Sequence, residues 1–155
     1  MNYVNSKVMI NQSVIDDLKK AAIIALEKTG DYVLGEVVEA QVIPFDTGFL
    51  QSESTYVDKK NSASGNVKIV SSTPYARRLY FHPEYDFNQN GWDEIVYGKR
   101  GRFAKNGREY KGKKVHHPGN ANAKGLWLED WTEDGKYAKD VKKAYELFFK
   151  ELGGL

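Results

Sequence analysis

The residues that could do chemistry form small groups whose spacing fits no catalytic or metal-binding motif. Four acids cluster around one tryptophan and could act as an acid–base pair or hold a divalent cation: Glu129, Asp130, Glu133 and Asp134. Their spacing is not that of a calcium-binding EF-hand loop. We therefore interpret the cluster as a solvated acidic face or, as a second interpretation, as a surface that meets a basic neighbour.

The histidines and the segment from Pro44 to Leu50 are equally weak candidates. His116 and His117 are adjacent, so they cannot both face one ion from a regular strand or helix, and no carboxylate stands at a zinc-motif spacing. The chain contains no phosphate-binding glycine loop, no Gly-x-Ser-x-Gly and no His-Glu-x-x-His. We expect no enzymatic activity, no metal and no cofactor. We predict instead a structural turn built by Pro44, Asp46, Thr47 and Gly48.

Length and composition narrow the class of protein. The chain has 155 residues, enough for one domain with a hydrophobic core, and we expect a single domain over residues 1–155. The absence of cysteine excludes a disulfide scaffold, a thiolate metal site and a cysteine nucleophile. The mean hydropathy is −0.61. No apolar run approaches the roughly 18 residues of a membrane span, so we expect no membrane contact.

Charge is distributed unevenly along the chain. The formal net charge is +2, yet eight basic residues and one acid between Lys99 and Lys114 give this stretch +7 and leave −5 on the other 139 residues. We call residues 99–114 the basic segment. Its cations are Lys99, Arg100, Arg102, Lys105, Arg108, Lys111, Lys113 and Lys114. Because large apolar side chains are scarce there, we predict a basic arm over residues 88–118 that projects from the domain.

The arm contains one local structural signal and allows three functional interpretations. Asn106-Gly107 favours a type I′ turn that would pair Phe103 with Tyr110 in a small hairpin. The cations could grip phosphates, as in a small DNA-binding protein that uses the 99–114 hairpin without sequence specificity. They could equally dock on an acidic protein surface, or form a soluble loop without a partner.

The remaining pattern predicts an α+β fold with a long N-terminal helix and a C-terminal helix packed on a small antiparallel sheet. Apolar residues at helical spacing predict helices over residues 13–43 and 139–152, and Pro44 ends the first. Residues 52–57 and 66–71 predict two strands joined by a solvated loop. Thr73 is placed to cap a short helix with Tyr75 turned inward. We predict irregular structure over residues 84–119. We expect the large aromatic side chains of residues 123–132 to pack onto the core.

Three segments, in this order, resemble proteins of long-tailed bacteriophages. Residues 42–52 contain Pro-Phe-Asp-Thr-Gly-Phe-Leu, which resembles the Pro-x-Asp-Thr-Gly-x-Leu signature that tail-completion and minor capsid proteins carry after a long N-terminal helix. Residues 71–82 are similar to the family's second strand and Pro-Tyr-Ala segment. Residues 120–131 resemble its Asn-x-x-Ala-x-x-x-Trp block before the last helix. The ordered set is most similar to the minor capsid group in phages and prophages of Gram-positive bacteria.

The resemblance implies a head–tail connector, a structural protein of the virion neck. It implies a homo-oligomeric ring within a stack that has portal, adaptor and stopper on one side and the tail terminator or tail tube on the other. Phage DNA would pass through the lumen, and the protein would reach the virion from the host cytoplasm. The resemblance implies no catalytic residues and a structural role for the Asp-Thr-Gly turn between helix and sheet. The 88–118 arm is longer than the family leads us to expect.

Overall fold

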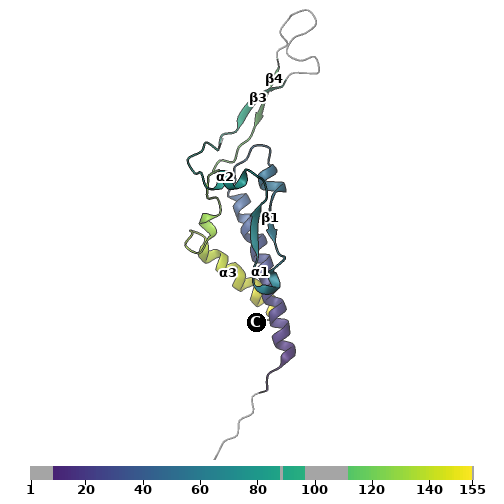
Figure 1. Cartoon of the computed structure of the whole chain (residues 1–155). Helices are drawn as coiled ribbons and strands as arrows, with labels where there is room; N and C mark the ends of the chain where they lie inside the picture. Colours follow the sequence, from purple (N-terminus) through teal and green to yellow (C-terminus); the bar gives the residue numbers. More distant parts are fainter. Residues whose placement is uncertain (1–8, 88, 97–111, 155) are drawn as a thin grey trace, which may run out of the picture.

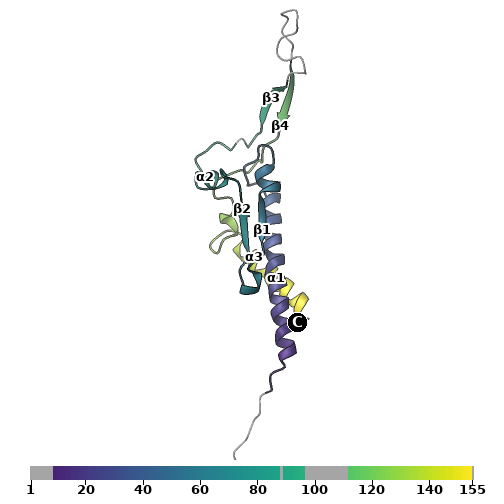
Figure 2. The ribbon, with the colours of Figure 1, turned by 45° about the vertical axis from the view of Figure 1, so that its right-hand side comes forward.

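The computed structural model describes residues 9–87, 89–96 and 112–154, and it confirms the α+β class. A long helix, α1 (Gln12–Glu39), contacts an antiparallel pair of strands, β1 (Thr55–Asp58) and β2 (Lys68–Ser71). The C-terminal helix, α3 (Ala138–Gly153), packs along α1 (Figure 1). A second pair, β3 (Trp92–Val96) and β4 (Lys113–His117), extends from one end (Figure 2). None of the helices in the described part of the chain has both the length and the apolar character needed to cross a membrane.

Helix α1 begins and ends at residues other than those predicted. Asn11 is the N-cap, because its side-chain oxygen accepts hydrogen bonds from the amides of Ser13 and Val14 at 3.2 and 3.4 Å. The helix ends at Glu39, and Gln41 then adopts a φ of 55° before Pro44 is reached. Its buried residues recur every fourth position and form one stripe: Ala21, Ala25, Thr29, Val33 and Val37.

The first sheet lies so close to α1 that the helix needs a glycine at the contact. A Cβ on Gly30 would stand 2.8 Å from a methyl carbon of Val57 and 2.8 Å from one of Val67. The strands pair from Thr55 with Ser71 to Asp58 with Lys68. The predicted first strand was three residues too long at its start, because residues Phe49–Glu53 form a turn of π-helix. Ser54 then closes that turn by donating its hydroxyl to the Phe49 carbonyl.

The short helix α2 (Ala76–Tyr80) begins later than predicted. Thr73 does not cap it: its buried hydroxyl oxygen has no hydrogen-bond partner, and only its backbone carbonyl accepts from the Ala76 amide. Tyr75 was expected to pack inward, yet it is 46% exposed. Tyr75 therefore lies half exposed at the surface, and Ala76 is the residue that packs into the core.

The core confirms that residues 123–132 dock aromatic side chains. Trp127 is 1% exposed and meets the ring of Tyr80 edge-on, with the ring centroids 4.7 Å apart. Trp131 is buried in the same cluster, at the end of a 3-10 turn (Glu129–Trp131). The cluster joins α1, the segment after it and α2 through these residues: Val33, Val37, Val42, Ile43, Leu50 and Ala76.

The strands β3 and β4 contradict the prediction of irregular structure over 84–119. They pair antiparallel, from Trp92 with His117 to Val96 with Lys113. We call this pair the ribbon. Ile95 and Val96 are largely exposed, so the strands show no alternation of buried and polar residues by which a sequence pattern would be recognised. Cross-strand side-chain pairs stabilise the ribbon instead, as described below.

Candidate functional site

The three phage-like segments meet at one place in the fold, which we call the junction. Asn120, the first residue of the third segment, is 6% exposed. Its side-chain amide donates to the main-chain carbonyl of Ile43 at 2.9 Å and to Oε1 of Gln51 at 2.6 Å. One buried amide therefore ties the third segment to both ends of the first.

Backbone hydrogen bonds complete the junction. The amide of Lys124 donates to the Val42 carbonyl at 3.0 Å, and that of Leu126 donates to the Tyr80 carbonyl at 2.8 Å. The Asn122 side chain donates to the Ala40 carbonyl, just beyond the end of α1. Leu126 adopts a φ of 49°, a strained conformation that lets the chain reach Tyr80. The third segment thus bonds to the first and the second.

The predicted turn forms one wall of the junction. Pro44 is buried, Asp46 and Thr47 are exposed, and Gly48 adopts a φ of 86°, a conformation that favours glycine. A Cβ on Gly48 would also stand 3.1 Å from the ring of Phe45. The Gly48 carbonyl accepts from the Ser52 amide at 2.9 Å, which leads the chain into the π-helical turn and on to β1.

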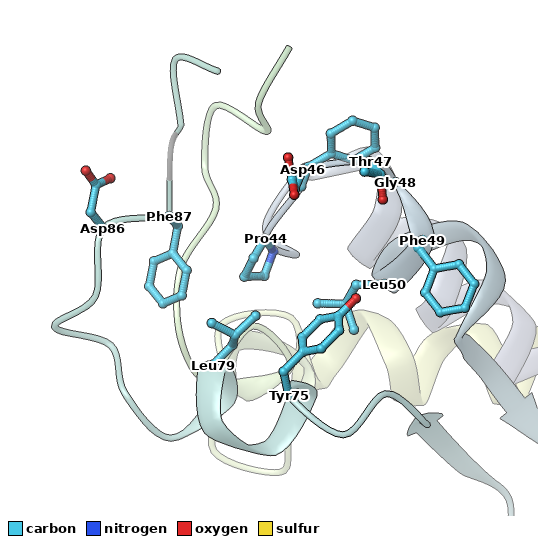
Figure 3. Close-up of a pocket in the computed structure, with 11 residues that line it drawn as sticks. Pro44, Asp46, Thr47, Gly48, Phe49, Leu50, Tyr75, Leu79, Asp86 and Phe87 are labelled. Carbon is cyan, nitrogen blue, oxygen red and sulfur yellow. The ribbon is translucent and has the colours of Figure 1, made fainter. Parts of the chain in front are cut away.

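A cavity of about 310 Å³ opens beside this turn, and we call it the turn pocket (Figure 3). Its walls come from the turn, from Tyr75 at the start of α2 and Leu79 within it, and from the loop that leads to β3. Two carboxylates, Asp46 and Asp86, contribute to a lining that is otherwise aromatic, aliphatic or neutral: Pro44, Phe45, Thr47, Gly48, Phe49, Leu50, Tyr75, Leu79 and Phe87. Phe49 and Tyr75 are each about half exposed beside the cavity.

Asp46 connects the turn pocket to the ribbon. Its Oδ1 accepts a hydrogen bond from the indole Nε1 of Trp92 at 2.7 Å. The same indole stacks on the imidazole of His117, with the ring centroids 4.2 Å apart and the planes 16° from parallel. The base of the ribbon is therefore held from the turn by one charge-assisted hydrogen bond and one ring contact.

Ion pairs across the ribbon use its acids and bases. Asp93 lies 2.7 Å from the Lys114 ammonium and 2.9 Å from Nδ1 of His116. These hydrogen bonds, that from Lys114 first, lower the pKa of Asp93 below its ordinary value. Glu94 lies 3.0 Å from Nε2 of His117. Both histidines therefore pair with carboxylates of β3, and in a solvated ribbon such contacts set register more than they add stability.

The structure describes only the last two cations of the basic segment. Lys113 and Lys114 are exposed at the start of β4, and Lys114 makes the ion pair with Asp93. The other six lie outside the described residues, as does the predicted hairpin of Phe103 and Tyr110: Lys99, Arg100, Arg102, Lys105, Arg108 and Lys111. The ribbon nevertheless identifies where the segment leaves the domain and where it returns.

The other chemical candidates have structural contacts. Asp130 accepts from the Lys124 ammonium at 2.7 Å, and its main-chain carbonyl accepts from the Tyr137 amide. His82 lies 2.6 Å from Glu84, and this hydrogen bond lowers the pKa of Glu84. Within residues 9–87, 89–96 and 112–154, no three His, Cys, Asp or Glu side chains lie close enough together to hold a metal ion.

Sequence reasoning missed two residues that build the site. Trp92 lies 46 positions from Asp46, and Asn120 lies 77 positions from Ile43, so no local pattern connects the partners. Asn120 did carry a signal, because it opens the third phage-like segment. For Trp92 the only signal in the sequence was a large aromatic residue within a polar stretch.

No family model, curated protein or solved structure matches the chain.

Proposed function

We propose that this chain is a structural subunit of the head–tail junction of a tailed bacteriophage. On this proposal it forms a homo-oligomeric ring in the virion neck, joins the capsid connector to the tail, and leaves a lumen for DNA. Its partners would be the adjacent neck proteins, and it would assemble in the host cytoplasm. The starting point is the ordered resemblance of residues 42–52, 71–82 and 120–131 to minor capsid and tail-completion proteins.

The observation that carries the proposal is the convergence of those three segments. They lie far apart in sequence, yet the buried amide of Asn120 and the backbone bonds of Lys124 and Leu126 bring them together. A chance resemblance spread over the chain has no reason to collect into one hydrogen-bonded junction. A family signature that specifies how helix, turn and sheet are joined would do so, and this supports a shared architecture.

The surface around the junction also suits a protein that works by contact. Phe49, in the π-helical turn, is 48% exposed, and Phe81, at the end of α2, is 60% exposed. Large exposed aromatics are enriched where one protein docks on another. The described body is elongated, with the ribbon at one end and the first turns of α1 at the other (Figures 1 and 2). An elongated subunit with unlike ends supports contact with different neighbours on its two sides.

The charge distribution supports a ring. A ring subunit meets its neighbour through two different faces, so one face can complement the other. The basic segment carries +7 and the rest of the chain −5, which supplies that complementarity within a single sequence. Electrostatic contacts of this kind orient subunits and speed their encounter, and salt weakens them when they are solvated.

Deletion of the gene from the phage or prophage that encodes the chain tests this function. We expect DNA-filled heads and separate tails that do not join, with normal virions restored when the gene is supplied in trans. The readout is electron microscopy of particles from the deletion strain. Normal tailed virions would refute the proposal. If the purified chain then bound duplex DNA with steep salt dependence, the competing DNA-binding function would replace it.

A further inference from the structure

The turn pocket has the chemistry of a receptor for a basic side chain. Two acidic residues, Asp46 and Asp86, are among its eleven lining residues, none of which is basic, and Figure 3 shows the Asp86 carboxylate turned away from the other labelled side chains. Apolar and aromatic groups, among them those of Pro44, Tyr75 and Phe87, make up most of the rest of the wall. An arginine or lysine side chain can lay its methylene stem on such a wall and its charge near an aromatic face or a carboxylate.

The size of the turn pocket favours a side chain over a larger ligand. Its volume of about 310 Å³ is at the lower end of the roughly 300–1,000 Å³ usual for ligand pockets. Phe49 and Tyr75 are half exposed at its edge, so their rings are accessible to an incoming group. An extended segment that inserts one or two long side chains fits this space better than a folded element does.

The chain itself contains a segment rich in long basic side chains. Between the two strands of the ribbon stand residues 97–111, which include six cations and the single acid Glu109. We infer that this stretch of one copy docks in the turn pocket of a neighbouring copy, with an arginine or lysine beside Asp46. The inference rests on the proposed function, because it supplies the contact between adjacent subunits of the ring.

The direction of the ribbon favours a neighbour over the same chain. Each strand has five residues, about 17 Å at the usual rise per residue, and both views agree that the ribbon runs away from the body (Figures 1 and 2). The basic stretch starts and ends at the far end of that ribbon. Docking of one copy's arm in the next copy's pocket is a heterologous contact. It repeats from copy to copy and closes into a ring when the rotation between neighbouring subunits divides a full turn evenly.

One charge placed in the turn pocket tests the contact. Thr47 lines the pocket and is exposed, so Thr47→Lys adds a cation there and keeps both partners of the Asp46–Trp92 bond in place. We expect self-association of the purified full-length chain at low salt to weaken at least about tenfold, because like charges then face each other. Ser64→Lys is the matched control: it adds the same charge at an exposed turn away from the pocket and should leave association unchanged.

Mixing two defective chains tests the head-to-tail direction. The first carries Thr47→Lys and an intact arm, and the second carries glutamine at the six cations of 97–111 and an intact pocket. Each alone should sediment as a monomer, and the mixture should form a one-to-one complex. A mixture that stays monomeric, or an arm variant that still associates by itself, overturns the inference. So does a wild-type chain that remains monomeric at low salt or associates only when duplex DNA is added.

Cross-linking separates a neighbour's arm from the chain's own. The natural sequence has no cysteine, so each introduced thiol is unique. Phe49→Cys mixed with Lys105→Cys should give disulfide-linked pairs at low salt, at least about tenfold more than Ser64→Cys mixed with Lys105→Cys. A chain carrying both Phe49→Cys and Lys105→Cys that closes only on itself overturns the inference.

The two proposals fail independently. If the Thr47→Lys variant forms normal rings, the docking contact is overturned and the proposed neck function is unaffected. Normal virions from the deletion strain refute the neck function, and the mixing experiment still decides whether arm and pocket bind.

Discussion

Replacement of Asn120 by alanine should lower the free energy of unfolding of the chain by a measurable amount. The side chain is 6% exposed and is the hydrogen-bond donor that links residues 43 and 51. Alanine removes both donors and leaves the Ile43 carbonyl in a buried environment, because Ile43 itself is fully buried. We therefore expect the free energy of unfolding of the whole chain to fall.

The expected loss follows from the burial of each partner. An orphaned buried carbonyl costs about 1–3 kcal/mol. Gln51 is half-buried and can turn toward water, so losing its bond costs about 0.5–1 kcal/mol. The free energy of unfolding should fall by about 1.5–4 kcal/mol in total, which lowers the Tm of a chain of this size by about 3–16 °C. These values apply to two-state unfolding of a single domain.

Urea unfolding followed by circular dichroism measures this loss, and Asn122 supplies the control. Asn122 is the same residue type two positions away, is exposed, and donates one hydrogen bond to the Ala40 carbonyl at 2.9 Å. Asn122→Ala should cost at most about 1 kcal/mol, because water can replace the amide. If Asn120→Ala costs no more than Asn122→Ala, then burial of the amide does not hold the three segments together and the junction argument is wrong.

Three further predictions concern α1 and the ribbon. Gly30→Ala should destabilise the chain, because the added Cβ meets two valine methyls at 2.8 Å, whereas Gly35→Ala has open space and should stabilise it by about 0.5–1 kcal/mol in urea unfolding. Pairing with Lys114 and His116 holds the pKa of Asp93 below its ordinary 3.8, so the stabilisation that Asp93 gives the ribbon is present above pH 3.8 and is lost as the pH falls through the lowered pKa. NMR chemical shifts of the ribbon amides should show this acid transition, and Asp93→Asn should abolish it. Trp92→Phe should raise hydrogen exchange in β3 and β4 without changing the Tm of the body, whereas Asp46→Asn keeps an acceptor for the indole and should raise exchange less.

The helices and the aromatic core were predictable because their signals are local. Apolar residues repeat every three or four positions in α1 and α3, and the repeat alone specifies an amphipathic helix. The start of α1 was misplaced because Asn11 and Ser13 are both good caps, and only the observed bonds to the amides of Ser13 and Val14 identify the first of them.

The ribbon and the site were not predictable by the same means. In β3, Asp93 and Glu94 are adjacent acids that point to opposite faces, and each finds its partner more than twenty positions away. The hydrogen bond that fixes the ribbon joins residues 46 positions apart. Periodicity reports burial on one face, and a strand pair stabilised by charges on both faces offers no such face to detect.

Asp46 allows anchoring and docking to occur together. A carboxylate has two oxygens and can accept several hydrogen bonds. Its Oδ1 accepts from the indole of Trp92, and the carboxylate keeps lone pairs that can accept from a second donor, such as a cation in the turn pocket that Asp46 lines. A neighbour's arm that reaches Asp46 would contact the side chain that also holds the base of this copy's ribbon. A two-stranded ribbon is marginal by itself in water, so docking at Asp46 and the placement of the ribbon would depend on the same carboxylate.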